Sequence, residues 1–351
     1  MDAAQTQVQQ AQIIEKLKQK LAGVKLPPDV SEKLADELMR VELVFKTKDF
    51  NPELDRQINY INFVCDLPWD KAGQDILDLK RAKMLLDKNH HGLEPIKDRI
   101  LEYLSILILN KSKGLIPKQP ILAFVGLVGS GKTSLAFSIA ESLGRPIIRI
   151  PFGGLGSALQ LRGESRVKSE AEPGLIVRAL KRAQVKNPVI LLDELDRVTE
   201  NARADIMGVL VELLDPEQNM AFLDHYVGFP FDLSQVLFVA TANNTGNIAT
   251  AVLDRLELIE MPFYTDEQKL VIGRDYLLPE ALQSAGLDPK LITIAPDVWP
   301  NIVRPLGFDG VIRSLKRNIV SMVGKIARMV VEGNKGPYII NSQNLNQFMS
   351  I

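Results

Sequence analysis

A glycine-rich segment that ends in lysine and threonine carries the clearest chemical signal in this sequence. Residues 126–133 read Gly-Leu-Val-Gly-Ser-Gly-Lys-Thr and match the pattern G-x-x-x-x-G-K-[ST] without a mismatch. Glycines allow successive backbone N–H groups to point at one anion, and a helix that begins there adds the positive end of its dipole. Lys132 can reach the outer phosphates, and the Thr133 hydroxyl can hold Mg²⁺. We therefore predict that the chain binds a nucleoside triphosphate.

The residues on either side of this segment form the elements that must position it. Residues 121–125 are all apolar, which predicts a buried strand that leads into the glycines. Leu135, Ile139 and Leu143 follow at helical spacing, and Gly144 stands where a helix ends. An ordinary glycine turn between a strand and a helix is the alternative, and the complete pattern with both flanks disfavours it.

A second apolar strand ends in two carboxylates. Residues 187–194 read Asn-Pro-Val-Ile-Leu-Leu-Asp-Glu, and ligands of parallel sheets bind beyond the carboxyl ends of the strands. Asp193 is placed to hold Mg²⁺ through its water shell, and Glu194 to activate the water that attacks a γ-phosphate. Two solvated residues that open a loop are the weaker alternative. Asn243 ends a further apolar strand, where its amide either contacts the γ-phosphate or serves only turn chemistry.

The composition argues against several classes of protein. In 351 residues, 42 Lys and Arg oppose 43 Asp and Glu, and this net charge of −1 does not call for nucleic acid or an anionic membrane as a partner. The single cysteine, Cys65, cannot form an internal disulfide and fits a reducing compartment. No apolar run reaches transmembrane length, and the first residues lack a signal-peptide pattern. We expect a soluble protein of the cytoplasm or of an organelle matrix.

Two adjacent histidines, His90 and His91, suggest a metal site at first sight. Only one other histidine, His225, is present, and no acidic or cysteine partner stands at ligand spacing. The sequence therefore disfavours a metal centre at these histidines.

The order of apolar patterns predicts an α/β domain between two helical parts. From residue 121 strands alternate with helices, which is typical of a parallel sheet with helices on both faces. We expect strands at 121–125, 145–152, 187–194, 235–243 and 257–261, helices at 31–45, 75–89, 94–110, 265–281 and 310–331, a further helix that begins at Asn51-Pro52, and short apolar runs at 291–294 and 338–340 that could pair. Residues 1–70 are then a helical module, residues 71–263 the nucleotide-binding domain and residues 264–351 a smaller, mainly helical lid domain.

Residues 75–351 resemble the ATPase part of the Lon family of ATP-dependent proteases, within the AAA+ class. The matching stretches are His90-His91-Gly92-Leu93, residues 97–104, the glycine segment, residues 187–196, Leu214-Asp-Pro-Glu-Gln-Asn219, Asp224-His225-Tyr226 and Leu253-Asp-Arg255. Residues 12–69, which end in Asp-Leu-Pro-Trp, resemble the helical end of the Lon N-terminal region. The resemblance implies an AAA+ P-loop sheet sandwiched by helices, with a helical lid after it.

The resemblance also implies roles for single residues. Lys132 and Thr133 become the Walker A pair, Asp193 and Glu194 the Walker B pair, Asn243 sensor 1, Arg313 sensor 2, and Arg255 the finger that reaches a neighbouring subunit's γ-phosphate. ATP or ADP with Mg²⁺ would be bound by Gly126, Gly129, Ser130, Gly131, Lys132, Thr133, Ser134 and Asp193, with His90, His91, Gly92 and Tyr264 around the adenine. Thr133 and Asp193 would hold the Mg²⁺, the latter through water. Arg255 as an ordinary surface arginine is the alternative.

This sequence departs from the family pattern in three places. The family usually has Gly-Pro-Pro-Gly-Val-Gly where residues 126–131 stand, a change that should not disturb phosphate binding. An aromatic-aliphatic pair normally grips substrate before Pro173-Gly174, whereas Lys168 and Ser169, followed by Glu170, stand here, so the usual grip is in question. The spacing from Asn243 to Arg255 is one residue longer than usual.

The family's Ser–Lys peptidase domain would follow the lid and its large N-terminal region would precede the helices. We expect an excised piece of a longer protease, with a free-standing ATPase of Lon descent as the alternative.

Three interpretations of the function follow. The leading one is the ATP-hydrolysing motor module of a Lon-type protease, which works as a hexameric ring and drives unfolded or damaged protein substrates toward a protease chamber. The second is a nucleotide-gated scaffold, or a remodelling protein of Lon descent with little proteolytic role. The third, an AAA+ protein that acts on nucleic acid, needs a basic face interleaved with aromatics, which the net charge of −1 and 6 % aromatic content disfavour. We expect no membrane partner.

Overall fold

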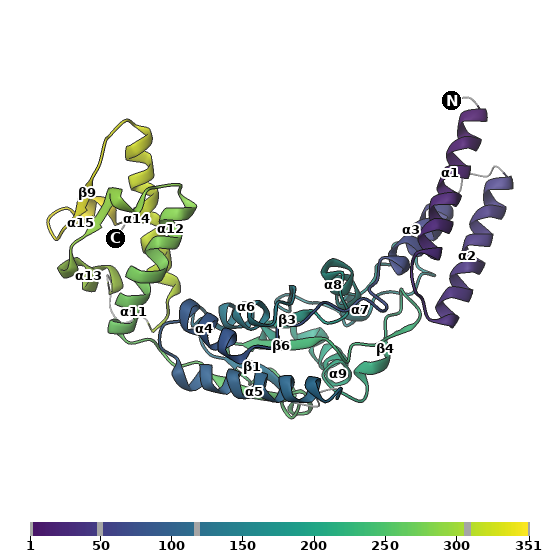
Figure 1. The fold of residues 1–351 in the computed structure, drawn as a ribbon, viewed down its shortest axis with the longest axis horizontal. Coiled ribbons are helices and arrows are strands. Elements are labelled where there is room, and N and C mark those ends of the chain that lie inside the picture. Colours follow the sequence, from purple (N-terminus) through teal and green to yellow (C-terminus); the bar gives the residue numbers. More distant parts are fainter. Residues whose placement is uncertain (1–2, 48–51, 116–119, 305–309, 350–351) are drawn as a thin grey trace.

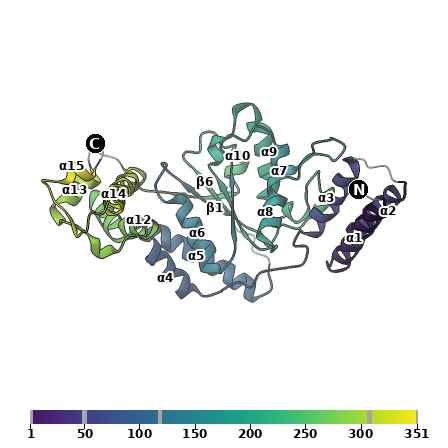
Figure 2. The ribbon, with the colours of Figure 1, turned by 90° about the horizontal axis from the view of Figure 1, so that it is seen from above.

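The computed structural model describes residues 3–47, 52–115, 120–304 and 310–349. Their elements form three parts in series along an extended molecule, with helices α1 to α3 at one end, a central sheet, and helices α11 to α15 at the other end (Figures 1 and 2). None of the described helices is both long and apolar enough to cross a membrane.

The central sheet has five strands, all parallel, in the order β2-β3-β6-β1-β7. They are β1 (Ile121–Val125), β2 (Ile147–Pro151), β3 (Val189–Asp193), β6 (Leu237–Ala242) and β7 (Leu256–Glu260). In register, Val125 at the end of β1 pairs with Ala242 of β6, and Leu192 of β3 pairs with Ala240. The carboxyl ends of β1, β3 and β6 therefore meet at one edge, and the predicted parallel α/β fold is confirmed.

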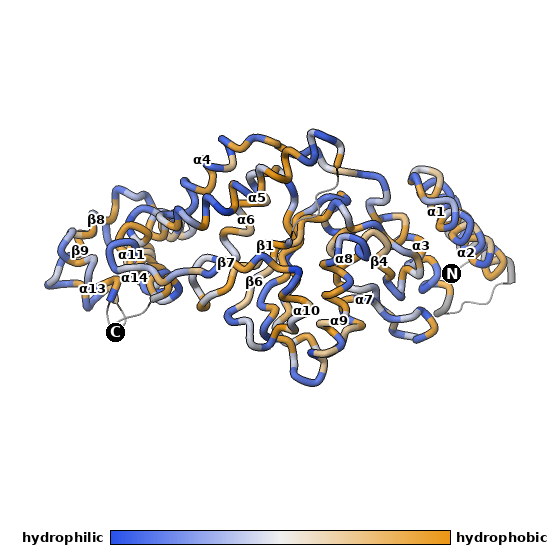
Figure 3. Tube along the Cα trace, turned by 90° about the horizontal axis from the view of Figure 1, so that it is seen from below, coloured by the Kyte–Doolittle hydropathy of each residue, from blue (hydrophilic) through white to orange (hydrophobic). Residues whose placement is uncertain are grey.

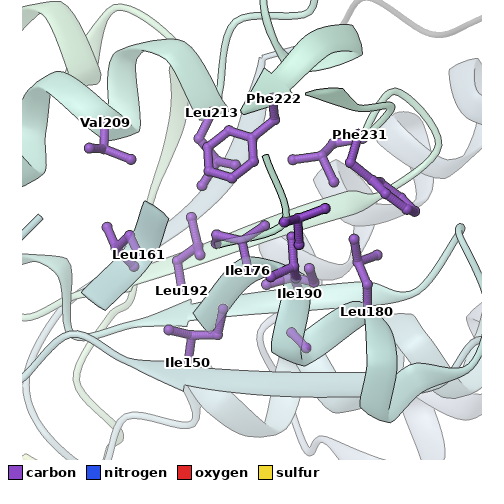
Figure 4. Packing of buried hydrophobic residues seen from close by; sticks show 14 of the residues in the cluster. Ile150, Leu161, Ile176, Leu180, Ile190, Leu192, Val209, Leu213, Phe222 and Phe231 are labelled. Carbon is purple, nitrogen blue, oxygen red and sulfur yellow. The ribbon is translucent and has the colours of Figure 1, made fainter. Parts of the chain in front are cut away.

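Alternate residues of each central strand enter different apolar clusters, so both faces of the sheet are buried. Ile190 and Leu192 of β3 pack in one cluster, whereas Val189 and Leu191 pack in the other. Figure 4 shows the first cluster between the sheet and the helices α8 (Leu175–Ala183) and α9 (Arg203–Leu213). The helices α4 (Leu79–Asn89), α5 (Glu94–Ser112) and α6 (Lys132–Leu143) contribute to the second cluster. The short helices α7 (Leu159–Arg162) and α10 (Thr250–Leu253) and the two-stranded ladder of β4 (Phe222–Leu223) and β5 (Pro230–Phe231) complete this part.

The N-terminal helices are α1 (Ala3–Ala22), α2 (Pro28–Thr47) and α3 (Pro52–Cys65). Their apolar faces join the first cluster, and hydrophilic and hydrophobic residues are interspersed along the traces of these helices (Figure 3). Tyr60 of α3 fixes them to the α/β part, because its hydroxyl donates to the carbonyl of Val227 at 2.8 Å and its ring meets that of Tyr226 edge-on. The helix predicted at 31–45 lies within α2, and the helix predicted to begin at Asn51-Pro52 is α3, described from Pro52.

The C-terminal part is helical around one small ladder. Its helices are α11 (Asp266–Ile272), α12 (Leu278–Ser284), α13 (Trp299–Val303), α14 (Arg313–Val331) and α15 (Leu345–Phe348), and β8 (Ile292–Ile294) pairs in parallel with β9 (Tyr338–Ile340). The predicted pairing of residues 291–294 with 338–340 is confirmed. The helix predicted at 265–281 is interrupted by a π-helical turn at Gly273–Leu277, where Gly273 packs against Trp299.

Two predicted helix starts are too early. The helix predicted from Asp75 begins at Leu79, because the Asp78 side chain caps it by accepting from the N–H groups of Lys80 and Arg81. Asp75 instead accepts two bonds from the Arg145 guanidinium, which anchors the preceding segment on the sheet. The long helix predicted from Gly310 begins at Arg313.

Candidate functional site

The glycine segment forms a loop between β1 and α6 at the carboxyl edge of the sheet. Gly131 caps α6 with a φ of +96°, a left-handed conformation that favours glycine, so Lys132 begins the helix. The N-terminus of α6 therefore opens at the loop, with the geometry that an anion site needs. The predicted strand, loop and helix all occur at the predicted residues.

A cavity of about 990 Å³ lies over this loop and extends to the lid helices. Twelve of the predicted site residues line it, namely His90, His91, Gly129, Gly131, Lys132, Thr133, Ser134, Asp193, Glu194, Asn243, Tyr264 and Arg313. Four of them do not line it, namely Gly92, Gly126, Ser130 and Arg255. The fold thus gathers residues from six separate stretches of sequence around one space large enough for a nucleotide.

Asp193 is the buried charge at the centre of this edge, and donors surround it. Its Oδ1 accepts from the hydroxyl of Thr241 at 2.5 Å and from that of Thr133 at 3.4 Å. Its Oδ2 accepts from Nε of Arg149 at 2.5 Å. Thr133 and Asp193 therefore present hard oxygen atoms side by side, which is the donor set that Mg²⁺ prefers when phosphates supply further ligands. These residues fit the metal.

Lys132 is folded back onto its own loop. Its ammonium donates to the carbonyls of Gly126 at 2.5 Å and Leu127 at 2.9 Å, and to the amide oxygen of Asn243 at 3.3 Å. Burial lowers the pKa of Lys132, against the attraction of the carboxylates nearby, of which Asp196 is the strongest. The ammonium lies within the loop that the pattern assigns to phosphate.

Asn243 follows the end of β6 and is held by Asp196. The Asn243 N–H donates to Oδ1 of Asp196 at 2.9 Å, and its side-chain Nδ2 donates to Oδ2 at 3.2 Å. These bonds turn the amide oxygen toward Lys132, so the side chain faces the cavity rather than closing a local turn.

Glu194 takes a different orientation from Asp193 because the chain turns sharply between them. Its φ of +60° is left-handed, and its N–H donates to the Thr241 hydroxyl at 2.9 Å. The Glu194 side chain is 30 % exposed and lies 3.7 Å from the guanidinium of Arg197. A partly solvated carboxylate at the cavity wall can accept a proton from a bound water, whereas the buried Asp193 is committed to its donors.

The lid touches the glycine loop directly. The N–H of Ile312, immediately before α14, donates to the Gly129 carbonyl at 3.1 Å. A Cβ atom placed on Gly129 would lie only 2.8 Å from Cβ of Arg313. The Tyr264 hydroxyl donates to the carbonyl of Ser130 at 3.2 Å, and burial raises the pKa of Tyr264 to about 12. Tyr264 and Arg313 thus lie against different residues of the same loop.

The group predicted around the adenine is divided in the structure. His90 is buried, and its Nε2 lies 2.9 Å from the Ser138 hydroxyl on α6. Burial, assisted by the charge of Lys97, lowers the pKa of His90 to about 4. His91 lines the cavity, whereas Gly92 lies against the side chain of Gln268.

Three further predicted residues lie outside the cavity wall. Gly126 packs on the end of β7, where an added Cβ would meet that of Met261 at 2.8 Å. The Ser130 hydroxyl is buried and has no hydrogen-bond partner among the described residues. Arg255 donates to the carboxylate of Asp215 at 2.9 Å and to the carbonyl of Ala251 at 2.7 Å, away from this chain's own cavity.

Comparison with known proteins gives the family. Residues 122–263 match the family model "ATPase family associated with various cellular activities (AAA)". The Lon protease of Lawsonia intracellularis is 42 % identical over 339 residues, which cover 96 % of this chain and 40 % of that protein. The Lon protease of Syntrophomonas wolfei is 41 % identical, over 96 % of this chain and 40 % of that protein. Lon protease 2 of Thermus thermophilus is 39 % identical, over 96 % of this chain and 43 % of that protein.

The chain carries an AAA ATPase domain homologous to that of the Lon proteases. The predicted resemblance is confirmed over nearly the whole chain, which spans about two fifths of the length of the curated relatives it matches. The match to the AAA model and the homology to the Lon proteases support ATPase activity and imply nucleotide binding, usually with Mg²⁺.

Sequence reasoning missed three polar residues of this AAA domain that contact the predicted ones. Thr241 bridges Asp193 and the Glu194 backbone, Asp196 holds Asn243, and Arg149 pairs with Asp193. Thr241 stands two residues before Asn243, so the period of a strand could have revealed it. Asp196 belongs to the stretch 187–196 that carries the resemblance, but its partner Asn243, which follows β6, is distant from it in sequence.

Residues 168–170 stand where the resemblance predicts an aromatic-aliphatic pair that grips substrate, and they are polar and exposed. The Lys168 ammonium pairs with Glu164 at 3.1 Å, and its side chain is 60 % exposed. Arg166, two residues earlier, pairs with Glu37 of α2 and stacks over the Tyr60 ring at 3.6 Å. This segment is therefore charged both at the exposed Lys168 and at Arg166, where it contacts α2 and Tyr60.

Replacing Gly129 with alanine should disturb the contact between the loop and the lid. We expect Gly129→Ala to weaken binding of a fluorescent ADP at least about tenfold, because its Cβ collides with Arg313 in addition to the left-handed strain of about 1 kcal/mol. Gly154→Ala is the matched control, since its φ of +86° is similar and no atom lies within 4 Å of the added Cβ. Equal affinities in the two variants would contradict the importance of this contact.

His90 should make the domain less stable in mild acid. Its pKa of about 4 in the folded state lies below its ordinary value of 6.5, so the unfolded chain binds more protons between these values. The stability is complete above pH 6.5 and falls as the pH decreases toward 4, by about 3 kcal/mol at most. Urea unfolding between pH 7.5 and 4 should show a shallower loss in His90→Gln, which can still bond to Ser138. Parallel pH profiles for the two proteins would disprove this role.

Proposed function

We propose that this chain is the ATP-hydrolysing motor module of a Lon-type protease. The observation that supports this most strongly is the convergence of Lys132, Thr133, Asp193 and Glu194 on one cavity that Arg313 of the lid also lines. A triphosphate over the loop would meet backbone N–H groups, an ammonium, two oxygen ligands for Mg²⁺ and a carboxylate base in one place.

The contacts of these residues give each of them a task in hydrolysis. Lys132 exchanges its bonds to the Gly126 and Leu127 carbonyls for bonds to phosphate oxygens. Thr133 and Asp193 would hold Mg²⁺, which would supply positive charge against the negative charge that develops during hydrolysis. Glu194 accepts the proton of the attacking water, and the Asn243 amide oxygen, which Asp196 turns toward the cavity, accepts a hydrogen bond from that water.

Arg255 is proposed to complete the site of a neighbouring subunit. It lies outside the cavity of its own chain, and Asp215 holds its guanidinium through one end. An arginine that stabilises transition-state charge is worth about 10³–10⁵ in rate, so a site that lacks it turns over slowly. Activity would then require a ring, which in the Lon family is a hexamer.

The substrates we propose are unfolded or damaged proteins, which lid motion would drive toward a peptidase chamber supplied by other parts of the assembly. The division at residues 70/71 and 263/264 would separate the helical module, the nucleotide-binding domain and the lid. A cytoplasmic or organelle-matrix setting fits the single buried cysteine. Nucleic acid and membranes are not part of this proposal.

A nucleotide-gated scaffold is the second candidate, because the exposed Lys168 and its partner Glu164 replace an aromatic grip. Such a protein would bind nucleotide and hardly turn it over. Sedimentation velocity with ATP, combined with phosphate release, distinguishes the two: ring formation with steady turnover supports the motor, and binding without turnover in assembled rings supports the scaffold.

Glu194→Gln tests the proposed base. We expect ATP hydrolysis to fall about 10²–10⁴-fold because the amide cannot accept a proton, while nucleotide affinity changes little. Phosphate release and binding of a fluorescent ATP are measured on the same preparation. Undiminished hydrolysis would reject Glu194 as the base.

A mixture of two inactive variants tests whether Arg255 acts on the neighbouring subunit. In a mixed ring of Arg255→Ala and Glu194→Gln subunits, some sites combine the intact Glu194 of one subunit with the intact Arg255 of the next. Phosphate release from the mixture should therefore exceed the sum of the two separate variants several-fold. A mixture no more active than that sum would place both residues in the same site.

A further inference from the structure

Arg149 of β2 lies against the Asp193 carboxylate, although the pattern of the sequence assigns it no role. In register, Pro151 of β2 pairs with Asp193 of β3, so Arg149 approaches the carboxylate from two residues earlier on the neighbouring strand. Its Nε donates to Oδ2 at 2.5 Å. The Arg149 side chain is 53 % exposed and that of Asp193 is 4 % exposed, so the cation stands between the buried charge and the cavity that it lines.

The two oxygen atoms of Asp193 face different groups. Oδ1 is turned toward the Thr133 hydroxyl of the phosphate loop and is fixed by Thr241, whereas Oδ2 is covered by Arg149. Lys132, the other cation of the cavity floor, donates to loop carbonyls instead. Arg149 is therefore the cation that neutralises this carboxylate in the described part of the chain.

We propose that Arg149 substitutes for Mg²⁺ at Asp193, so that the site can accept a nucleotide before the metal arrives. This inference rests on the proposed nucleotide site. A buried carboxylate without a counter-charge repels an incoming phosphate, and a guanidinium is charged at every physiological pH. Arg149 at Oδ2 and Mg²⁺ on the Oδ1 side would each supply positive charge to the same carboxylate, so each reduces the need for the other. Arg149 acts through Asp193 and is a positioning residue.

The consequence is a measurable coupling between the side chain at position 149 and the metal. In the wild type, removing Mg²⁺ leaves Asp193 paired, so nucleotide affinity should depend only modestly on the metal. Without the guanidinium, metal-free binding has to occur beside an unpaired carboxylate, whereas binding with Mg²⁺ is supported by the metal itself. Loss of Arg149 should therefore weaken binding selectively in the absence of metal.

The experiment measures the dissociation constant of a fluorescent ADP in EDTA and in excess Mg²⁺, and the ratio of the two values is the readout. We expect Arg149→Gln to raise this ratio about tenfold. Arg149→Lys, which keeps a charge, should remain within about threefold of the wild type. Lys316→Gln is the matched control, because it removes another cation that lines the cavity but pairs with Glu280, so its ratio should be unchanged.

Thermal unfolding verifies that each variant is folded, and Arg149→Met, which preserves the aliphatic stem, replaces Arg149→Gln if the latter does not fold. An unchanged ratio in the variant that lacks the charge overturns the proposal, and so does an equal loss of affinity in EDTA and in Mg²⁺. A wild type that binds no ADP under either condition refutes the proposed function itself, which is a different result from an unchanged ratio.

Discussion

The carboxylate of Asp193 is the charge around which the carboxyl edge of the sheet is arranged. It is almost fully buried, and a buried charge left without partners is strongly destabilising. Its three donors come from β2, from β6 and from the first turn of α6, so the compensation holds only while these elements keep their register. Apolar packing brings the strands together, and the polar contacts of one side chain fix how their ends align.

The same edge explains why neighbouring residues of one short stretch serve different purposes. The left-handed turn at Glu194 directs its side chain away from that of Asp193, toward partial solvent. Asp196, one turn later, is buried and holds Asn243 by accepting hydrogen bonds from its backbone N–H and from its side-chain amide. Thr241 binds both the Asp193 carboxylate and the Glu194 backbone, which ties the turn to the adjacent strand. A local run of acidic residues thus becomes a buried charge at Asp193, a partly exposed carboxylate at Glu194 and a support for Asn243 at Asp196.

Sequence patterns predicted the parallel sheet and the glycine loop because apolar periodicity and motif spacing are local. Contacts made by single side chains across strands are not local, and this is why Arg149 was missed. The conformation of Lys132 was missed for another reason. The motif describes a lysine bound to phosphate, whereas this ammonium donates hydrogen bonds to the carbonyls of its own loop. The helix start predicted at Asp75 was wrong because the Asp75 carboxylate binds Arg145 and Asp78 provides the N-cap of the helix. The roles assigned to Arg255 and Arg313 stay predictions.

The phosphate loop contacts the lid at two points and the end of the preceding strand at a third. Gly126 packs on Met261 at the end of β7, the Ser130 carbonyl accepts from Tyr264, and the Gly129 carbonyl accepts from the N–H that precedes α14. All three contacts involve loop backbone or a glycine with no room for a side chain, so the loop cannot adjust to a ligand by moving side chains alone. A change in the loop backbone therefore alters contacts at Tyr264, where the C-terminal part begins, and at Ile312, immediately before α14. These contacts connect the loop to the C-terminal helices through packed backbone.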